Sequence, residues 1–200
     1  MAAFPVDPAS RREGTRPALV ALRAVSKSFG QVHALRGASL ALHAGEVHAL
    51  AGENGAGKST VVGLIGGEYQ PDGGAVCFDG QPVRLLGPRD ARQHGVAVIH
   101  QEPTRFPDLS VAENVFMGRQ PMRGRRIDRA GMRRRAVALF DRLGVPIDPN
   151  RQSRGLSIAD QQIIEIAKAL STDARIIVMD EPTAALSDVE AKRLFRIVRE

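Results

Sequence analysis

The stretch AGENGAGKST, residues 51–60, places glycines, one lysine and two hydroxyl side chains in a spacing that suits phosphate binding. Residues 52–59 fit the pattern G-x-x-x-x-G-K-[ST]. Glycines allow the backbone to curl around phosphates with its N–H groups inward, because side chains would block that approach. Lys58 would then bridge the β- and γ-phosphates of a nucleotide, and Ser59 would ligate Mg²⁺. The predicted nucleotide-binding residues here are Gly52, Glu53, Asn54, Gly55, Ala56, Gly57, Lys58, Ser59 and Thr60.

Three short apolar runs predict strands that are buried on both faces of a parallel sheet. They are VHALAG (47–52), VAVIHQ (96–101) and RIIVMDE (175–181). Helical patterns lie between them, as in KSTVVGLIGG and DQQIIEIAKAL, and this alternation predicts an α/β fold. Since ligands in such sheets bind beyond the carboxyl ends of the strands, we expect the three segments to meet at one site.

Two carboxylates follow the last of these runs. Asp180 is predicted to hold the Mg²⁺ shell, and Glu181 to align and deprotonate the attacking water. Beside the phosphate loop, this interpretation is favoured over an acidic pair that merely caps a loop. A GTPase is disfavoured because the chain has no N-K-x-D motif, and a small-molecule kinase would not need a carboxylate directly after Asp180.

Length and composition limit the remaining classes. Two hundred residues suit one domain with a sizeable core or part of a larger protein, and no apolar run is long enough to cross a bilayer. Residues 1–17 have no signal-peptide pattern and are predicted to be a disordered tail. Cys77 is the only cysteine, which suits a reducing cytosol, and the five histidines show no metal-ligand spacing.

The net charge of +6 raises the alternative of nucleic-acid binding, and much of it lies in residues 119–135. The second half of this segment predicts an amphipathic helix that Asp128 caps and Gly144 ends. Its apolar stripe is Met132, Ala136, Leu139, Phe140 and Leu143. The arginines on the other face are therefore predicted to be a solvated surface.

Taken together, the motifs resemble those of the ATP-binding cassette (ABC) family, from about residue 18 to the end of the chain. Gln101 in VIHQEP matches the Q-loop, and IIVMDEPTAAL matches Walker B. RGLSIADQQIIEIAKAL is similar to the signature helix, in which Ser157 would meet the γ-phosphate bound by an opposite cassette. Phe29, in VSKSFG, lies where the family places an aromatic side chain that stacks on adenine.

The resemblance implies a RecA-like P-loop NTPase core with an N-terminal antiparallel β portion and a helical insertion subdomain over about 106–155. It implies ATP and Mg²⁺ as cofactors. The catalytic residues that it implies are Glu181, Gln101 and Lys58, and the metal-binding residues are Ser59, Gln101 and Asp180.

Within the family, three segments resemble the ATPases of bacterial carbohydrate importers of the ribose, rhamnose and autoinducer-2 group: LSVAENVFMGR (109–119), LSIADQQIIEIAKAL and EPTAALS. This likeness implies the first of two fused cassettes, with membrane permease subunits and a periplasmic substrate-binding protein as partners and no nucleic acid. It implies a peripheral position on the cytoplasmic face of the bacterial inner membrane. Two alternatives stay open: a soluble cassette protein that acts on ribosomes or nucleic acid, and an ATP-binding module that does not hydrolyse.

The signature departs from the family pattern L-S-G-G-Q. Ile158 and Ala159 replace the glycines, and Asp160 replaces the glutamine, which puts a negative charge near the expected phosphate. Ser187 stands where the family usually has aspartate in the D-loop.

Residues 186–200 predict a helix, which in the family leads into a central strand and a switch histidine. No histidine follows His100. Because a missing central strand would leave two rows of backbone groups unpaired, we expect the isolated chain to be poorly folded or aggregation-prone and to hydrolyse ATP negligibly.

Overall fold

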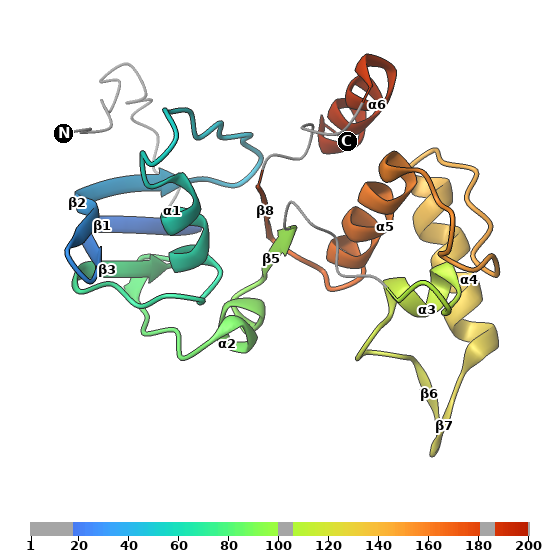
Figure 1. Ribbon diagram of the computed structural model, residues 1–200. Helices are drawn as coiled ribbons and strands as arrows, with labels where there is room; N and C mark the ends of the chain where they lie inside the picture. Colours follow the sequence, from blue (N-terminus) through green and yellow to red (C-terminus); the bar gives the residue numbers. More distant parts are fainter. Residues whose placement is uncertain (1–17, 100–105, 181–186, 200) are drawn as a thin grey trace. The chain divides into compact units, whose positions relative to one another are not determined.

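The computed structural model describes residues 18–99, 106–180 and 187–199. The chain divides into two compact units, with the boundary between Ala97 and Val98. Each unit has its own buried apolar residues, and Figure 1 labels most of the elements along the chain.

The first unit contains an antiparallel sheet of four strands in the spatial order β2-β1-β3-β4. The strands are β1 (Val20–Phe29), β2 (Val32–Leu42), β3 (Gly73–Phe78) and β4 (Gln81–Pro82). A tight turn with Gly30 at φ +58° joins β1 to β2. In β1, the alternate residues Val20 and Leu22 are buried, as the period of two in a strand requires. The predicted N-terminal antiparallel portion is confirmed.

Two helices accompany this sheet, α1 (Lys58–Ile65) and α2 (Pro88–Gln93). Val61, Leu64 and Ile65 of α1 are buried. The strand predicted over 47–52 is wrong: these residues form irregular chain, and Val47 is 73% exposed. A strand needs a neighbouring backbone ladder, and no described strand pairs with this segment.

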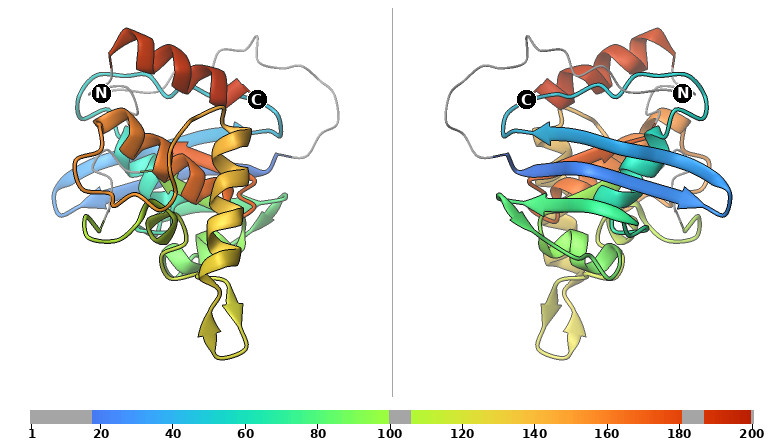
Figure 2. Two further views of the ribbon diagram at one scale, coloured as in Figure 1. Left: turned by 90° about the vertical axis from the view of Figure 1, so that its right-hand side faces the viewer. Right: turned by 90° about the vertical axis from the view of Figure 1, so that its left-hand side faces the viewer.

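The second unit is mainly helical. Its helices α3 (Val111–Val115), α4 (Arg129–Arg142) and α5 (Ile158–Leu170) contact one another, and α6 (Asp188–Arg199) follows later in the chain. A short hairpin of β6 (Met122–Arg123) and β7 (Arg126–Ile127) leads into α4 and extends beyond its N-terminal end (Figure 2). Strand β8 (Ile176–Met179) is the hydrogen-bonded neighbour of β5 (Val96–Ile99), in which the unit boundary falls.

The sequence predicted the helices of this unit well. The Oδ1 atom of Asp128 accepts a hydrogen bond from the Gly131 N–H at 2.8 Å, so it caps α4 as expected. Gly144 has φ +62° just after the helix, which confirms the predicted end. Met132 and Phe140, two residues of the predicted apolar stripe of α4, are buried. Among the described helices, none combines the length and the apolar character needed to cross a bilayer.

Candidate nucleotide-binding site

The glycine-rich turn at residues 52–57 leads directly into α1. Gly55 and Gly57 have φ angles of +83° and +85°, in the left-handed region that glycine adopts most readily. A Cβ atom on Gly57 would lie 2.7 Å from the carbonyl oxygen of Ala34 in β2, so the loop packs directly against the sheet. Backbone conformation and space therefore both require glycine at position 57.

The N-terminus of α1 presents unpaired donors. Its N-cap, Gly57, has no side chain to cap the helix, and the first turn contains no acidic residue. The first N–H that bonds back into the helix is that of Val61, which donates to the Gly57 carbonyl at 3.0 Å. The N–H groups of Lys58, Ser59 and Thr60 therefore have no acceptor within the helix, and with the positive end of the helix dipole they suit an anion.

The Lys58 ammonium lies across this turn. Its Nζ atom donates to the carbonyl oxygens of Gly52 at 2.9 Å and Glu53 at 3.0 Å. An ammonium has three donors, so one is left for a ligand at the exposed mouth of the loop. Backbone N–H groups around one held cation are the donor set that the phosphates of a nucleotide require.

Phe29 lies at the end of β1 in the same unit and is 42% exposed. The ring of Tyr69 packs edge-on against it, with ring centroids 5.0 Å apart and planes at 77°. The Tyr69 ring also lies against α1, where a Cβ atom on Gly63 would lie 2.5 Å from it. Tyr69 therefore connects the predicted adenine-stacking residue to the phosphate-loop helix. Sequence analysis missed it, although it is the only tyrosine of the chain and follows α1 closely.

Asp72 fixes the end of β1 that carries Phe29. Its carboxylate accepts hydrogen bonds from the Lys27 ammonium at 2.9 Å and from the Ser28 N–H at 2.7 Å. The bond from Lys27, followed by that from Ser28, holds the pKa of Asp72 below its usual range. The Lys27 Nζ atom also lies 5.5 Å from the centre of the Phe29 ring, a cation–π contact.

The remaining predicted site residues belong to the second unit or lie outside the described residues. Asp180 directly follows β8, is half-buried, and donates its backbone N–H to the Ile99 carbonyl at 3.1 Å. Gln101 and Glu181 lie outside the described residues. The meeting of the three strand ends at one site stays a prediction.

Ser157 is the N-cap of α5. Its Oγ atom accepts a hydrogen bond from the Asp160 N–H at 3.1 Å, and its side chain is exposed, so the hydroxyl proton is available to a ligand. Ala159 is buried, while Ile158 is 53% exposed. Asp160 lies in the first turn, where a carboxylate stabilises the helix through its dipole.

A family model for the ABC transporter matches residues 35–184, most of the chain. The chain belongs to the ABC transporter family. It is 63% identical over 187 residues to the ribose import ATP-binding protein RbsA 1 of Streptomyces coelicolor. This alignment covers 93% of this chain and 37% of the relative. It is 48% identical over 186 residues to a putative ribose/galactose/methyl galactoside import ATP-binding protein of Burkholderia ambifaria. That alignment covers 93% of this chain and 36% of the relative. The chain thus spans little more than a third of the length of these relatives.

Solved structures show the same fold. The ADP conformation of MJ1267, an ATP-binding cassette of an ABC transporter, superposes with a TM-score of 0.80 and 26% identity over 91% of this chain and 76% of that chain. The cassette MJ0796, in a dimeric post-hydrolysis state bound to ADP and Pi, gives a TM-score of 0.74 at 25% identity, with coverage of 90% and 81%. The predicted α/β fold of the P-loop NTPase class is confirmed. The bounds of the helical insertion over 106–155 stay a prediction.

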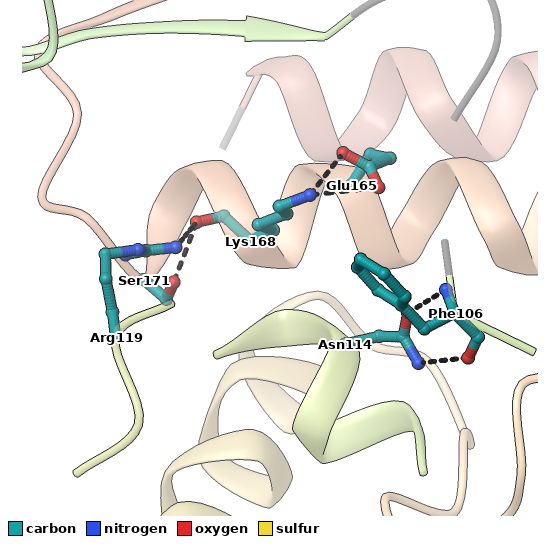
Figure 3. A network of polar contacts seen from close by, with 6 residues as sticks. All are labelled: Phe106, Asn114, Arg119, Glu165, Lys168 and Ser171. Atoms are coloured by element: carbon teal, nitrogen blue, oxygen red, sulfur yellow. Dashed lines mark hydrogen bonds and ion pairs between the residues drawn. The ribbon is translucent and has the colours of Figure 1, made fainter. Parts of the chain in front are cut away.

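Within this ABC domain, a buried amide organises the segments before and after α3. Asn114 is 4% exposed and donates to the Ser153 hydroxyl at 2.7 Å. It also donates to the Phe106 carbonyl at 3.0 Å, and its Oδ1 atom accepts from the Phe106 N–H at 2.8 Å (Figure 3). Gln161 acts similarly on the signature turn, because its Nε2 atom donates to the Leu156 carbonyl at 2.7 Å. Sequence analysis missed both residues, since a buried amide leaves no periodic signal.

The start of α3 has a capping box, which the sequence pattern S-x-x-E at residues 110–113 could have identified. Glu113 accepts from the Ser110 N–H at 2.9 Å and from its hydroxyl at 2.8 Å, while the Glu113 N–H donates back to the hydroxyl at 3.2 Å. The backbone bond from Ser110, then that from its hydroxyl, lowers the pKa of Glu113, with a smaller contribution from the positive charge of Arg129.

Among the described residues, no group of three or more histidine, cysteine or acidic side chains could hold a metal by itself.

Proposed function

We propose that this chain binds ATP with Mg²⁺ and hydrolyses it, as the nucleotide-binding part of an ABC importer for a sugar or a related small molecule. The observation that carries the proposal is the uncapped N-terminus of α1, with glycines in left-handed conformations and the Lys58 ammonium held across the turn. The names of the ribose import relatives support the substrate class.

In this proposal, the N–H groups of the loop and Lys58 bind the phosphates. Ser59 and Asp180, with Gln101, supply the protein ligands of Mg²⁺, which neutralises phosphate charge when it is bound. Phe29 offers its exposed face to the adenine, in the orientation that Tyr69 sets.

Hydrolysis requires a base beside the γ-phosphate, and we assign that role to Glu181. Its carboxylate would orient a water, take its proton as the water oxygen bonds to phosphorus, and so assist departure of ADP. Ser157 would donate its hydroxyl to the γ-phosphate bound by a second cassette. The dimeric cassette with ADP and Pi among the similar structures supports such a pairing.

The proposed partners are membrane permease subunits and a second cassette, with a periplasmic substrate-binding protein acting through the permease. This places the protein on the cytoplasmic face of a bacterial inner membrane. Gln101 would link the nucleotide state to the permease, because a conformational step must connect hydrolysis to transport.

The test is sugar-dependent ATP hydrolysis by the importer assembled with its permease and binding protein. Glu181→Gln should lower hydrolysis at this site by about 10²–10⁴-fold while ATP still binds, because only proton transfer is removed. Glu46→Gln, an exposed glutamate of the first unit, is the matched control. Hydrolysis at the wild-type rate in the Glu181→Gln protein would contradict the assignment, and hydrolysis unaffected by any sugar would contradict the importer proposal.

A further inference from the structure

Residues 119–135, which join α3 to α4 and include the first half of α4, carry the excess positive charge of the protein. Residues 119–135 hold eight of the 28 basic residues and one of the 22 acidic ones, so the rest of the chain is close to neutral. Apart from the arginines exposed on α4, the structure separates these residues into two groups.

One group is structural. The Arg119 guanidinium donates to the Lys168 carbonyl at 3.3 Å, at the C-terminal end of α5, where Ser171 also binds the same carbonyl at 2.7 Å (Figure 3). Arg129 lies close enough to Glu113 for its charge to lower the pKa of that carboxyl. The bond from Arg119 ties the start of the segment to the end of α5.

The other group lies on the β6–β7 hairpin, residues 122–127, which we call the arginine hairpin. Arg123 pairs directly with Arg126 across the two strands, and Arg125 lies in the turn between them. All three are exposed, and among the described residues no carboxylate forms a hydrogen bond or ion pair with them. Like charges directly opposite each other destabilise a strand pair, so an anionic partner would relieve this repulsion.

The hairpin also exposes apolar surface. Met122 and Ile127 form the other cross-strand pair and are 57% and 46% exposed. Because successive residues of a strand point to opposite faces, this apolar pair and the Arg123–Arg126 pair lie on opposite faces of the hairpin. The base is fixed by the Asp128 N–H, which donates to the Pro121 carbonyl at 2.7 Å, and the hairpin extends beyond α4 (Figure 2).

We propose that the arginine hairpin binds an anionic phospholipid surface. Met122 and Ile127 enter the boundary between head groups and acyl chains, and the three arginines contact the lipid phosphates around them. The exposed arginines of α4, Arg133 and Arg134, add to the attraction at longer range. A nucleic acid is the weaker candidate because residues 119–135 contain no aromatic side chain on which a base could stack.

This lipid contact goes beyond ATP hydrolysis and transport, and it can be measured without nucleotide. The purified protein is mixed with vesicles of phosphatidylcholine alone, or of phosphatidylcholine and phosphatidylglycerol in equal parts, and the bound fraction is measured by flotation in a density gradient, which separates vesicle-bound protein from aggregates. Binding should require phosphatidylglycerol and weaken as salt is raised. The triple variant Arg123→Gln, Arg125→Gln, Arg126→Gln should bind roughly a hundredfold less, at about fivefold per arginine.

The matched control is Arg23→Gln, Arg36→Gln, Arg89→Gln, which removes the same charge from exposed positions of the first unit. It should bind within about twofold of the wild type. Met122→Ser with Ile127→Ser should lower binding roughly tenfold without changing its salt dependence. Equal losses in the two arginine variants would overturn the proposal, because charge alone would then explain the binding.

A second measurement does not depend on how well the triple variant folds. A polarity-sensitive dye on Arg125→Cys should report an apolar environment on anionic vesicles, whereas the same dye on Arg89→Cys should not. No response at position 125, or tighter binding to an RNA or DNA oligonucleotide than to the vesicles at the same salt, would refute the lipid contact.

Discussion

The phosphate loop and the signature turn each place a small residue before a helix, but they are built differently. The phosphate loop, residues 52–57, gets its shape from glycine conformations and from Lys58 bonding to its own turn. The signature turn, residues 153–157, is held by the buried amides of Asn114 and Gln161. The bonds that Lys58 makes within the phosphate loop follow from nearby residues, whereas the bond from Asn114 to the signature turn comes from a residue far away in the sequence that the signature motif does not include.

The two helix starts also differ in what they offer an anion. Gly57 leaves the first N–H groups of α1 without a capping side chain. At α5, the Ser157 hydroxyl already caps the Asp160 N–H, and the Asp160 carboxylate lies in the first turn. Since an acid at this position already satisfies part of the helix dipole, the N-terminus of α5 should attract phosphate less strongly than that of α1.

The largest expected effect concerns Gly57. Gly57→Ala would force a Cβ atom to within 2.7 Å of the Ala34 carbonyl oxygen and strain a left-handed backbone, so ATP affinity should fall by roughly a hundredfold, about 3 kcal/mol. Gly55→Ala is the control, because its φ is similar but no atom lies within 4 Å of the added Cβ. Its loss should be clearly smaller, and titration with Mg-ATP measures both. Equal losses would mean that contact with β2 does not shape the loop.

For the second region, the corresponding change is Asn114→Ala. It removes a buried amide that bonds to Phe106 and Ser153, so the free energy of unfolding of the second unit should fall by about 3 kcal/mol. The change should be measured by urea denaturation followed by hydrogen exchange of α3 and α5. An unchanged free energy of unfolding would contradict the claim that the buried bonds of Asn114 stabilise the second unit.

A smaller effect, dependent on pH, is expected at the capping box of α3. The pKa of Glu113 is lower in the folded protein than in the unfolded chain, so its stabilisation is present at neutral pH and is lost as the pH falls below about 4.3 through the folded-state pKa. Glu113→Gln should therefore cost about 1 kcal/mol at neutral pH and progressively less in acid. Asp141→Asn, at an exposed site on α4, is the control, and thermal unfolding against pH is the measurement. A cost for Glu113→Gln that does not change with pH would contradict this role.

The smallest effect is expected at Asp160. If its charge reaches the phosphate of a second cassette, Asp160→Gln should lower the ATP concentration needed for cassettes to pair, by less than about 1 kcal/mol because the group is partly exposed. Helix α5 would lose a favourable first-turn charge, a cost of similar size in the free energy of unfolding. Pairing should be followed by light scattering during an ATP titration. An unchanged midpoint would show that Asp160 faces solvent in the pair.

The sequence predicted the local features of this fold and missed those that depend on distant partners. The phosphate loop, the cap of α4 at Asp128 and the end at Gly144 each follow from nearby residues. The strand expected over 47–52 did not form, because apolar content cannot supply the neighbouring ladder that a strand requires. The contact of Tyr69 with Phe29 and Gly63 and the bonds of Asn114 join residues that no motif groups together. The exposed hairpin was missed because its strands have only two residues each.

The central claim is that the N-terminus of α1 and Lys58 bind the phosphates of ATP. The most direct measurement is the affinity of this chain for Mg-ATP in the importer assembled with its permease, with Lys58→Ala compared with Lys192→Ala, an exposed lysine on α6. The account predicts that Lys58→Ala weakens binding by about 10–100-fold, as the loss of a charged hydrogen bond does, while Lys192→Ala binds like the wild type. Equal affinity of the Lys58→Ala protein and the wild type would contradict it.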